Sequence, residues 1–290
     1  MSLHPGTDAW VTHRNLLFTV AYEMLGSAAD AEDVLQEVWL RWSRVTDTVH
    51  DPRAYLVRIT TRLSLNALRA HSRRREDYVG PWLPEPLLTT PDVAEDVELA
   101  ESVSTAMLLV LETLGPTERA VFVLRKVFEL PYDEIAEATA RSPAAVRQIA
   151  HRAREHVAAR RPRREVTVAE QQAVVERFLA AVAGDDLQLL VDVLDPEVVL
   201  LTDGGGVKQA ALRPIVGVDK VLRFLTGVYV AATRGAPVLV NGAPALRLEL
   251  DGALEAIVTF AVTQGRVTAA YIVRNPHKLL AVDQETVLTR

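Results

Sequence analysis

Residues 132–161 read YDEIAEATARSPAAVRQIAHRAREHVAARR, and this stretch predicts two short helices joined by a tight turn. Ser142 offers a side-chain oxygen that can cap the second helix, and Pro143 follows where a missing backbone N–H costs nothing. Apolar residues then recur at helical spacing, which predicts the buried side of this helix. They are Val146, Ile149, Ala150, Ala153 and Val157.

The outward side of the second helix is basic. Its polar residues are Arg147, Gln148, His151, Arg152 and Arg154. Arginine bonds guanine edges or phosphates and glutamine bonds adenine, so a capped helix of this kind suits the DNA major groove. Eight arginines and one acid fall within 141–164, and this excess predicts salt-dependent binding to phosphates. The alternative is a basic helix of an ordinary bundle that meets only water.

The whole chain has 290 residues, a net charge of −6 and no cysteine. This length allows two or three domains, and the acidic remainder should discourage indiscriminate contact with DNA. The absence of cysteine excludes disulfides, thiolate nucleophiles and cysteine-based zinc sites, and the histidines are too scattered for a metal centre. No apolar run approaches the roughly 18 residues of a membrane span, and the first residues lack a signal-peptide pattern. We therefore expect a cytoplasmic protein with no cofactor, no metal and no membrane contact.

Three domains and a linker follow from the pattern along the chain. Residues 1–77 predict an all-helical domain, because apolar residues recur at helical spacing in three successive segments. Residues 78–91 predict a linker, since their prolines are too dense for a helix or a central strand. Residues 92–164 predict a second helical domain, which ends in the segment quoted above.

Residues 165–290 predict a domain of a different class. Two helical patterns come first, and five strand-like runs follow from Val198 onward. Asn241-Gly242 and Asp251-Gly252 lie between runs and are strong signals for tight hairpin turns. Successive hairpins predict an antiparallel meander whose one face is covered by the earlier helices, which is an α+β domain.

Three segments resemble bacterial sigma factors, the promoter-recognition subunits of RNA polymerase. LPYDEIAEATARSPAAVRQIAHRARE (130–155) resembles the helix-turn-helix that reads the minus-thirty-five element. YEMLGSAADAEDVLQEVWLRW (22–42) resembles the segment that grips the β′ coiled coil of the polymerase. DPRAYLVRITTRLSLNALRAHSRRR (51–75) resembles the segment that opens and binds the minus-ten element. Their order and the Pro-rich linker indicate the compact extracytoplasmic-function (ECF) class.

This resemblance implies three sets of functional residues. The minus-thirty-five set is Ser142, Ala144, Arg147, Gln148, His151, Arg152 and Arg154. The minus-ten set is Arg58, Arg62, Asn66, Arg69 and Arg73. The polymerase-binding set is Asp30, Glu32, Asp33, Gln36 and Glu37. The implied partners are promoter DNA and core RNA polymerase, through its β′ coiled coil and β flap, and we expect a monomer when the protein is free.

Two of these assignments have simpler alternatives. Acidic residues in the first turn of a helix also compensate its dipole, so the acidic set need not meet a partner. Asn66 equally fits a helix-surface amide.

The last domain resembles the SnoaL-like group of the cone fold named after nuclear transport factor two (NTF2). A subset of ECF sigma factors, including the SigJ type, carries such a domain at its end. Three local signatures support this subset: Trp82-Leu83-Pro84-Glu85-Pro86, Asp203-Gly204-Gly205-Gly206 and Asn275-Pro276-His277-Lys278-Leu279. The family usually has Asp at the middle of the last motif, so His277 departs from it. The resemblance implies that Trp82, Pro84 and the two later motifs form a regulatory interface, which replaces a separate anti-sigma protein.

The predicted fold class is therefore multidomain, with two all-α sigma domains followed by an α+β NTF2-like domain. Cone folds often enclose a pocket, so one alternative gives the last domain a small ligand or a catalytic site. The polar candidates for that pocket are Asp203, Arg213, Glu255, Tyr271, Arg274, Asn275 and His277. No spacing among them marks an acid–base dyad, and we expect no enzyme. Another alternative is a stand-alone regulator, which would have no use for a polymerase-binding segment.

Overall fold

The computed structural model describes residues 7–75, 77–160, 166–184, 187–228 and 233–290. Contacts between residues divide the chain into two compact units. The first unit comprises 1–76, 107–161 and 287–290, and the second comprises 77–106 and 162–286. The predicted linker and the residues just after it thus group with the carboxyl-terminal residues. The predicted domain boundaries stay predictions.

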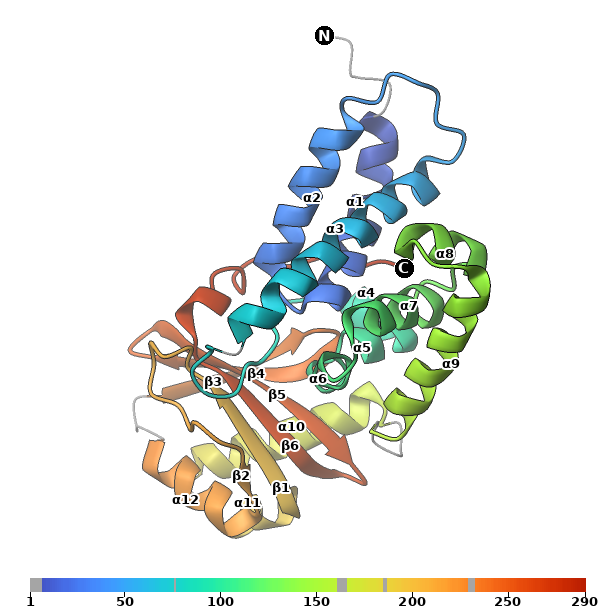
Figure 1. Cartoon of the computed structure of the whole chain (residues 1–290). Helices are drawn as coiled ribbons and strands as arrows, with labels where there is room; N and C mark the ends of the chain where they lie inside the picture. The colour runs from blue at the N-terminus through green and yellow to red at the C-terminus, as the bar shows by residue number, and fades with distance from the viewer. Residues whose placement is uncertain (1–6, 76, 161–165, 185–186, 229–232) are drawn as a thin grey trace. The chain divides into compact units, whose positions relative to one another are not determined.

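The first unit is helical (Figure 1). Its helices are α1 (Thr7–Leu25), α2 (Ala28–Trp42), α3 (Pro52–Arg75), α7 (Pro116–Lys126), α8 (Tyr132–Thr139) and α9 (Pro143–Ala158), while α6 (Thr105–Glu112) begins in the second unit and ends in the first. The amino-terminal three pack on one another around the apolar stripe of α1, which is buried from Leu16 to Leu25. Ser27 caps α2 by accepting a hydrogen bond from the Asp30 backbone N–H at 3.1 Å.

Helices α8 and α9 are joined by the tight turn that the sequence predicts. Ala140 ends α8 in the left-handed conformation (φ 54°), and its backbone N–H bonds back to α8 carbonyls. Ser142 Oγ accepts from the Ala145 backbone N–H at 3.2 Å, so the predicted cap is present. The buried side of α9 consists of Val146, Ala150, Ala153 and Val157, while Ile149 is only half-buried. The turn and the cap together fix the direction in which α9 leaves α8.

The second unit is α+β. Its helical elements are α4 (Pro91–Glu95), α5 (Val97–Val103), α10 (Val168–Ala183), α11 (Leu187–Val193), α12 (Val218–Val228) and the 3₁₀ turn η1 (Pro276–Lys278). Its strands are β1 (Leu194–Asp203), β2 (Ile215–Val216), β3 (Thr233–Val240), β4 (Ala243–Leu250), β5 (Ala253–Thr263) and β6 (Arg266–Val273). They form one sheet in the order β2-β1-β6-β5-β4-β3.

Strands β3 to β6 form the predicted meander. Asn241-Gly242, Asp251-Gly252 and Gln264-Gly265 have positive φ at both positions, as type I′ hairpin turns require. The sheet is not antiparallel throughout, because β1 lies parallel to β6. The chain leaves β1 through β2 and α12 before it enters the meander, and this long connection allows β1 to pair in parallel with the last strand.

Helices α10, α11 and α12 lie along one face of this sheet (Figure 1). Their apolar residues pack with alternate residues of the strands, such as Ala256, Val258 and Phe260 of β5. Thr259 points to the opposite face, since side chains alternate along a strand. There its hydroxyl bonds the Thr105 hydroxyl at 3.0 Å. Part of the 77–106 segment therefore packs on the face of the sheet that lies opposite α10, α11 and α12.

Candidate functional site

The basic face of α9 is exposed as predicted. Exposed side chains include every member of the minus-thirty-five set: Ser142, Ala144, Arg147, Gln148, His151, Arg152 and Arg154. Tyr132, at the start of α8, lies beneath two cations, with its ring centroid 4.7 Å from the Arg125 guanidinium and 5.7 Å from that of Arg147. Stacking on Tyr132 orients Arg147 without using its hydrogen-bond donors.

The minus-ten set follows one side of α3. Arg62, Asn66 and Arg69 are exposed and Arg58 is half-buried, while the side chain of Arg73 falls outside the described residues. Arg58 lies over the ring of Tyr55, whose centroid is 5.3 Å from the guanidinium. Three cationic or amide side chains thus share an exposed strip of this helix.

Two arginines of this strip contact the helix-turn-helix. Arg58 Nη1 bonds Glu137 Oε2 at 3.0 Å, and Arg62 Nη2 donates to the Glu137 backbone carbonyl at 2.9 Å. Glu137 belongs to α8, so α3 and α8 are held together by the side chains that the sequence assigns to DNA. In this structure Arg58 and Arg62 therefore contact α8 of the same chain.

A buried arginine makes a second contact inside the first unit. Arg119 of α7 is 2% exposed, donates from Nε to the Glu23 carbonyl of α1 at 2.9 Å, and forms an ion pair with Glu112. Burial lowers the pKa of Arg119 to about 9, against the opposing effect of the nearby Glu23 charge. The guanidinium therefore stays charged at neutral pH, and it joins α1 to α7.

The polymerase-binding set lies on α2. Asp33 and Gln36 are exposed, and Asp30, Glu32 and Glu37 are half-buried. Glu32 pairs with Arg14 of α1 at 2.8 Å, and Glu37 pairs with Arg41 at 2.8 Å. The acidic face is therefore present, although two of its carboxylates already have partners within the first unit.

In the second unit, Asp203 at the end of β1 holds the linker. Its carboxylate is fully buried (0% exposed) and accepts from Tyr78 Oη at 2.6 Å, from the Leu83 backbone N–H at 2.9 Å and from the Gly205 backbone N–H at 3.0 Å. Burial, together with the hydrogen bond to Asp203, raises the pKa of Tyr78 above its ordinary value. Tyr78 therefore stays protonated and donates.

Lys278 of η1 completes this group, which we call the linker clamp (Tyr78, Trp82, Leu83, Asp203, Asn275 and Lys278). Its ammonium is 2.8 Å from Asp203 Oδ2, donates to the Leu83 carbonyl and lies 4.1 Å from the centroid of the Trp82 ring. The side chain of Lys278 is 8% exposed. A buried cation is stable only with such partners, so the clamp depends on Asp203.

The clamp also explains the neighbouring glycines. A Cβ on Gly205 would lie 2.2 Å from Asn275 Nδ2, which itself donates to Tyr78 Oη at 2.9 Å. A Cβ on Gly204 would lie 2.1 Å from the Lys208 carbonyl. Neighbouring residues therefore approach the backbone of Gly204 and Gly205 too closely for a side chain at either position.

The other residues of the predicted regulatory interface lie outside the linker clamp. Pro84 and Leu279 are buried, Pro276 is half-buried, and a Cβ on Gly206 would lie 3.3 Å from Val79. His277 is exposed, and its backbone N–H donates to Asn275 Oδ1 at 3.1 Å. The departure of His277 from the family motif therefore places an imidazole outside the clamp.

A second attachment holds the other end of the linker. The Asn241 side chain accepts from the Leu87 backbone N–H at 2.8 Å and donates to the Val103 carbonyl at 2.7 Å. Next to it, the Gly242 backbone N–H donates to Thr89 Oγ1 at 3.0 Å. Sequence reasoning assigned Asn241 only to a hairpin turn and did not single out Tyr78. Their partners lie more than a hundred residues away, so no local signal marks them.

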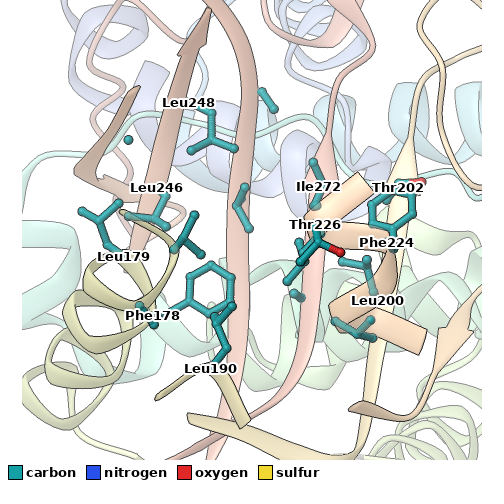
Figure 2. A pocket seen from close by; sticks show the side chains of 18 of the residues that line it. Phe178, Leu179, Leu190, Leu200, Thr202, Phe224, Thr226, Leu246, Leu248 and Ile272 are labelled. Carbon is teal, nitrogen blue, oxygen red and sulfur yellow. The ribbon is translucent and has the colours of Figure 1, made fainter. Parts of the chain in front are cut away.

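The carboxyl-terminal domain contains a cavity of about 590 Å³ between the sheet and helices α10 to α12 (Figure 2). Of the seven polar candidates, only Glu255 and Arg274 line it. Asp203 and Asn275 belong to the clamp, and Arg213 and His277 are exposed. Tyr271 is buried outside the lining, and burial raises its pKa to about 12. The candidates do not converge on one site.

Two properties can be stated for the described part of the chain. None of its helices combines the length and the apolar character that crossing a membrane requires. Nor do its histidine, aspartate and glutamate side chains gather into a group that could hold a metal ion.

Comparisons with known proteins show which families the chain resembles. Residues 10–74 match the family model "Sigma-70 region 2", and residues 104–157 match "Sigma-70, region 4". The chain is 39% identical to the ECF RNA polymerase sigma factor SigJ of Mycobacterium tuberculosis, over 91% of this chain and 90% of that protein. It is 33% identical to a probable ECF sigma factor, SigI, of the same species, over 96% and 97% of the two chains.

A solved structure shares the fold. The crystal structure of M. tuberculosis SigJ matches with a TM-score of 0.77 and 36% identity, and it covers 95% of this chain and 99% of that one. The predicted fold class, two helical sets followed by an α+β domain, is confirmed.

Proposed function

Because the chain belongs to the family of ECF RNA polymerase sigma factors, we propose that its carboxyl-terminal domain restrains promoter recognition in cis by holding the linker. As a member of this family the chain acts in transcription initiation, binds core RNA polymerase and promoter DNA, and is not an enzyme. The alternatives of a stand-alone regulator and of an enzyme are thereby set aside. The proposal concerns how this activity is controlled.

The linker clamp is the observation that carries the proposal. Asp203 binds the linker through Tyr78 and the Leu83 backbone, and Asn241 binds it again through Leu87. A linker fixed at both of these places cannot extend. Residues 77–106 connect the two sigma regions, and fully extended they would reach about 100 Å. The contacts with Asp203 and Asn241 therefore remove most of the distance over which the two regions could separate.

The contact between α3 and α8 supports the same conclusion. The minus-ten and minus-thirty-five elements are, by their names, about 25 base pairs apart, which is about 85 Å along B-form DNA. Helices that touch through Arg58 and Glu137 cannot occupy both elements at once. We infer that the first unit is in a closed state, which must open before α3 and α9 engage a promoter.

The surfaces for the partners follow from the exposed faces. We assign the acidic face of α2 to core polymerase, because a basic partner surface would complement it. The exposed strip of α3 is assigned to the opened minus-ten strand, where arginines follow the phosphates and Asn66 bonds a base edge. The exposed face of α9 is assigned to the minus-thirty-five duplex.

Replacing Arg147 tests the assignment of α9. Arg147→Ala should reduce promoter-dependent transcription by core polymerase about 5- to 150-fold, because one arginine contact to a base or phosphate contributes about 1–3 kcal/mol. The assay is transcription in vitro on the promoter of the protein's own operon. Arg223→Ala, which removes an exposed arginine of α12, is the matched control and should leave transcription unchanged. Equal transcription by Arg147→Ala and the wild-type protein would refute the assignment.

Replacing Glu137 tests the closed state. Glu137→Ala removes the carboxylate that holds Arg58, so binding of a single-stranded minus-ten oligonucleotide to the complex with core polymerase should tighten about two- to fivefold. The effect is modest because the pair is partly exposed and surface ion pairs contribute at most about 1 kcal/mol. Asp133→Ala, on an exposed site of the same helix, removes the same charge without this contact and serves as control. If the two variants bind the oligonucleotide equally, the Glu137 contact does not restrain α3.

A further inference from the structure

We propose that the cavity of the carboxyl-terminal domain binds an amphipathic small molecule with an apolar body and a single anionic head. This proposal stands apart from the role of the linker clamp. The cavity volume of about 590 Å³ lies within the range of about 300–1,000 Å³ that is typical of small-molecule sites. All of its lining residues belong to the second unit.

The apolar walls of the cavity determine what kind of ligand body fits inside it. Figure 2 shows Phe178 and Leu190, from α10 and α11, on one side of the cavity, and Phe224 and Leu200, from α12 and β1, on the other. Most of the other lining residues are leucine, valine and alanine. Ordered water needs two to four polar partners, which such walls do not supply, so an apolar body is the better occupant.

The two threonines of the lining already have partners. Thr202 Oγ1 accepts from the Ala211 backbone N–H at 2.7 Å, and Thr226 Oγ1 donates to the Leu222 carbonyl at 3.0 Å. These hydroxyls therefore do not require a polar group on the ligand body. Polar recognition is left to the charged end of the cavity.

That charged end carries an excess of positive charge. Arg274 pairs with Glu255 and donates to the Gln209 carbonyl at 2.6 Å, and Lys208 Nζ lies 2.9 Å from Glu255 Oε2. Two cations and one carboxylate leave a net charge of +1 beside the lining residues Glu255 and Arg274. An anionic head is attracted to this end and a cationic head is repelled.

The same cluster is unsuited to proton transfer. Burial acts to raise the pKa of Glu255, but hydrogen bonds from Arg274 and Lys208 outweigh it, and the pKa lies below its ordinary value. Glu255 is therefore ionised at neutral pH and held by two cations. It contributes charge and geometry, which suit a binding site.

The test uses three probes that share a twelve-carbon chain: dodecanoate, dodecanol and dodecylammonium. Binding to the full chain is measured by calorimetry, below the micelle concentrations of dodecanoate and dodecylammonium and below the solubility limit of dodecanol. Dodecanoate should bind roughly tenfold more tightly than dodecanol, and dodecylammonium more weakly than both, as one surplus charge near a partly exposed site would give. Lys208→Ala leaves the Glu255–Arg274 pair neutral, so it should remove most of the preference for the carboxylate.

A variant whose cavity is filled by a larger side chain provides the second part of the test. Ala256 lies in the lining on β5, and Ala256→Leu should weaken dodecanoate binding at least tenfold. Ala261→Leu adds the same volume on the opposite face of the same strand and should leave binding unchanged. Circular dichroism of each variant verifies the fold. If Ala256→Leu does not fold, octanoate and dodecanoate binding to the wild-type protein are compared, and the longer chain should bind more tightly.

The proposal is overturned by any of four results. They are no binding of dodecanoate up to its solubility limit, equal binding of the three probes, equal binding of octanoate and dodecanoate, or unchanged binding by a folded Ala256→Leu chain. The proposal is supported if Lys208→Ala loses the preference for the carboxylate and Ala256→Leu loses dodecanoate binding.

Discussion

Asp203→Ala should release the linker and lower the free energy of unfolding of the second unit by about 3–5 kcal/mol. The carboxylate of Asp203 is fully buried and accepts hydrogen bonds from Tyr78, the Leu83 backbone and Lys278. Its removal leaves the ammonium of Lys278 buried without its carboxylate, and this is the main cost. Urea unfolding measures the stability, and hydrogen exchange of residues 77–89 measures release of the linker.

Two further variants make this prediction specific. Asp192→Ala removes a carboxylate from an exposed site of α11 and should change neither quantity. Lys278→Met should be milder than Asp203→Ala, because Asp203 then keeps three of its donors, from Tyr78, Leu83 and Gly205. It also replaces Asp203→Ala if that chain does not fold. Wild-type exchange rates in residues 77–89 of Asp203→Ala would contradict the clamp.

Arg119→Met should destabilise the first unit by about 3–5 kcal/mol. The substitution removes a buried cation, so Glu112 loses its charged partner and the Glu23 carbonyl loses a donor. Because Arg119 joins α7 to α1, the amides of these two helices should exchange faster, while those of β5 should keep their wild-type rates. Hydrogen exchange resolves the two units, which a single unfolding transition does not.

A double variant tests whether the cost arises from the broken pair. Arg119→Met combined with Glu112→Leu replaces both charges by apolar groups, and such replacements are often close to neutral. The double variant should therefore regain part of the stability that Arg119→Met loses, while the buried carboxylate of Glu23 still lacks the nearby charge of Arg119. Equal protection of α1 and α7 in Arg119→Met and the wild-type protein would show that the contact does not hold the two helices together.

Features that depend on neighbouring residues could be predicted from the sequence. Ser142 caps α9 because a side-chain oxygen and the Ala145 N–H lie three residues apart. The hairpin turns at Asn241 and Asp251 likewise follow from the tolerance of Asn, Asp and Gly for positive φ. The first half of β3 carries no clear strand signal, because Gly235 and Pro237 are unfavourable in a strand and are tolerated here at the edge of the sheet.

Contacts between distant segments could not be predicted in this way. The parallel pairing of β1 with β6 depends on the path of the chain through α12, and no residue of β1 encodes its partner. The resemblance to the family identified Asp203 and Lys278 as important, whereas their contacts with Tyr78 and Leu83 required the structure. The ion pair between Arg58 and Glu137 could not be predicted either, because each residue alone looks like a solvent-exposed helix position. The assignment of α2, α3 and α9 to their partners stays a prediction.

The most direct test of restraint in cis is promoter-dependent transcription by core polymerase with the wild-type, Asp203→Ala and Asp192→Ala chains. The promoter is that of the protein's own operon, and the folded concentrations are matched. Release of the linker should let the closed first unit open, so Asp203→Ala should yield about tenfold more transcript, which corresponds to a shift of about 1.4 kcal/mol in the opening equilibrium. Asp192→Ala should match the wild-type protein. Transcript from Asp203→Ala at or below the wild-type level would contradict the account.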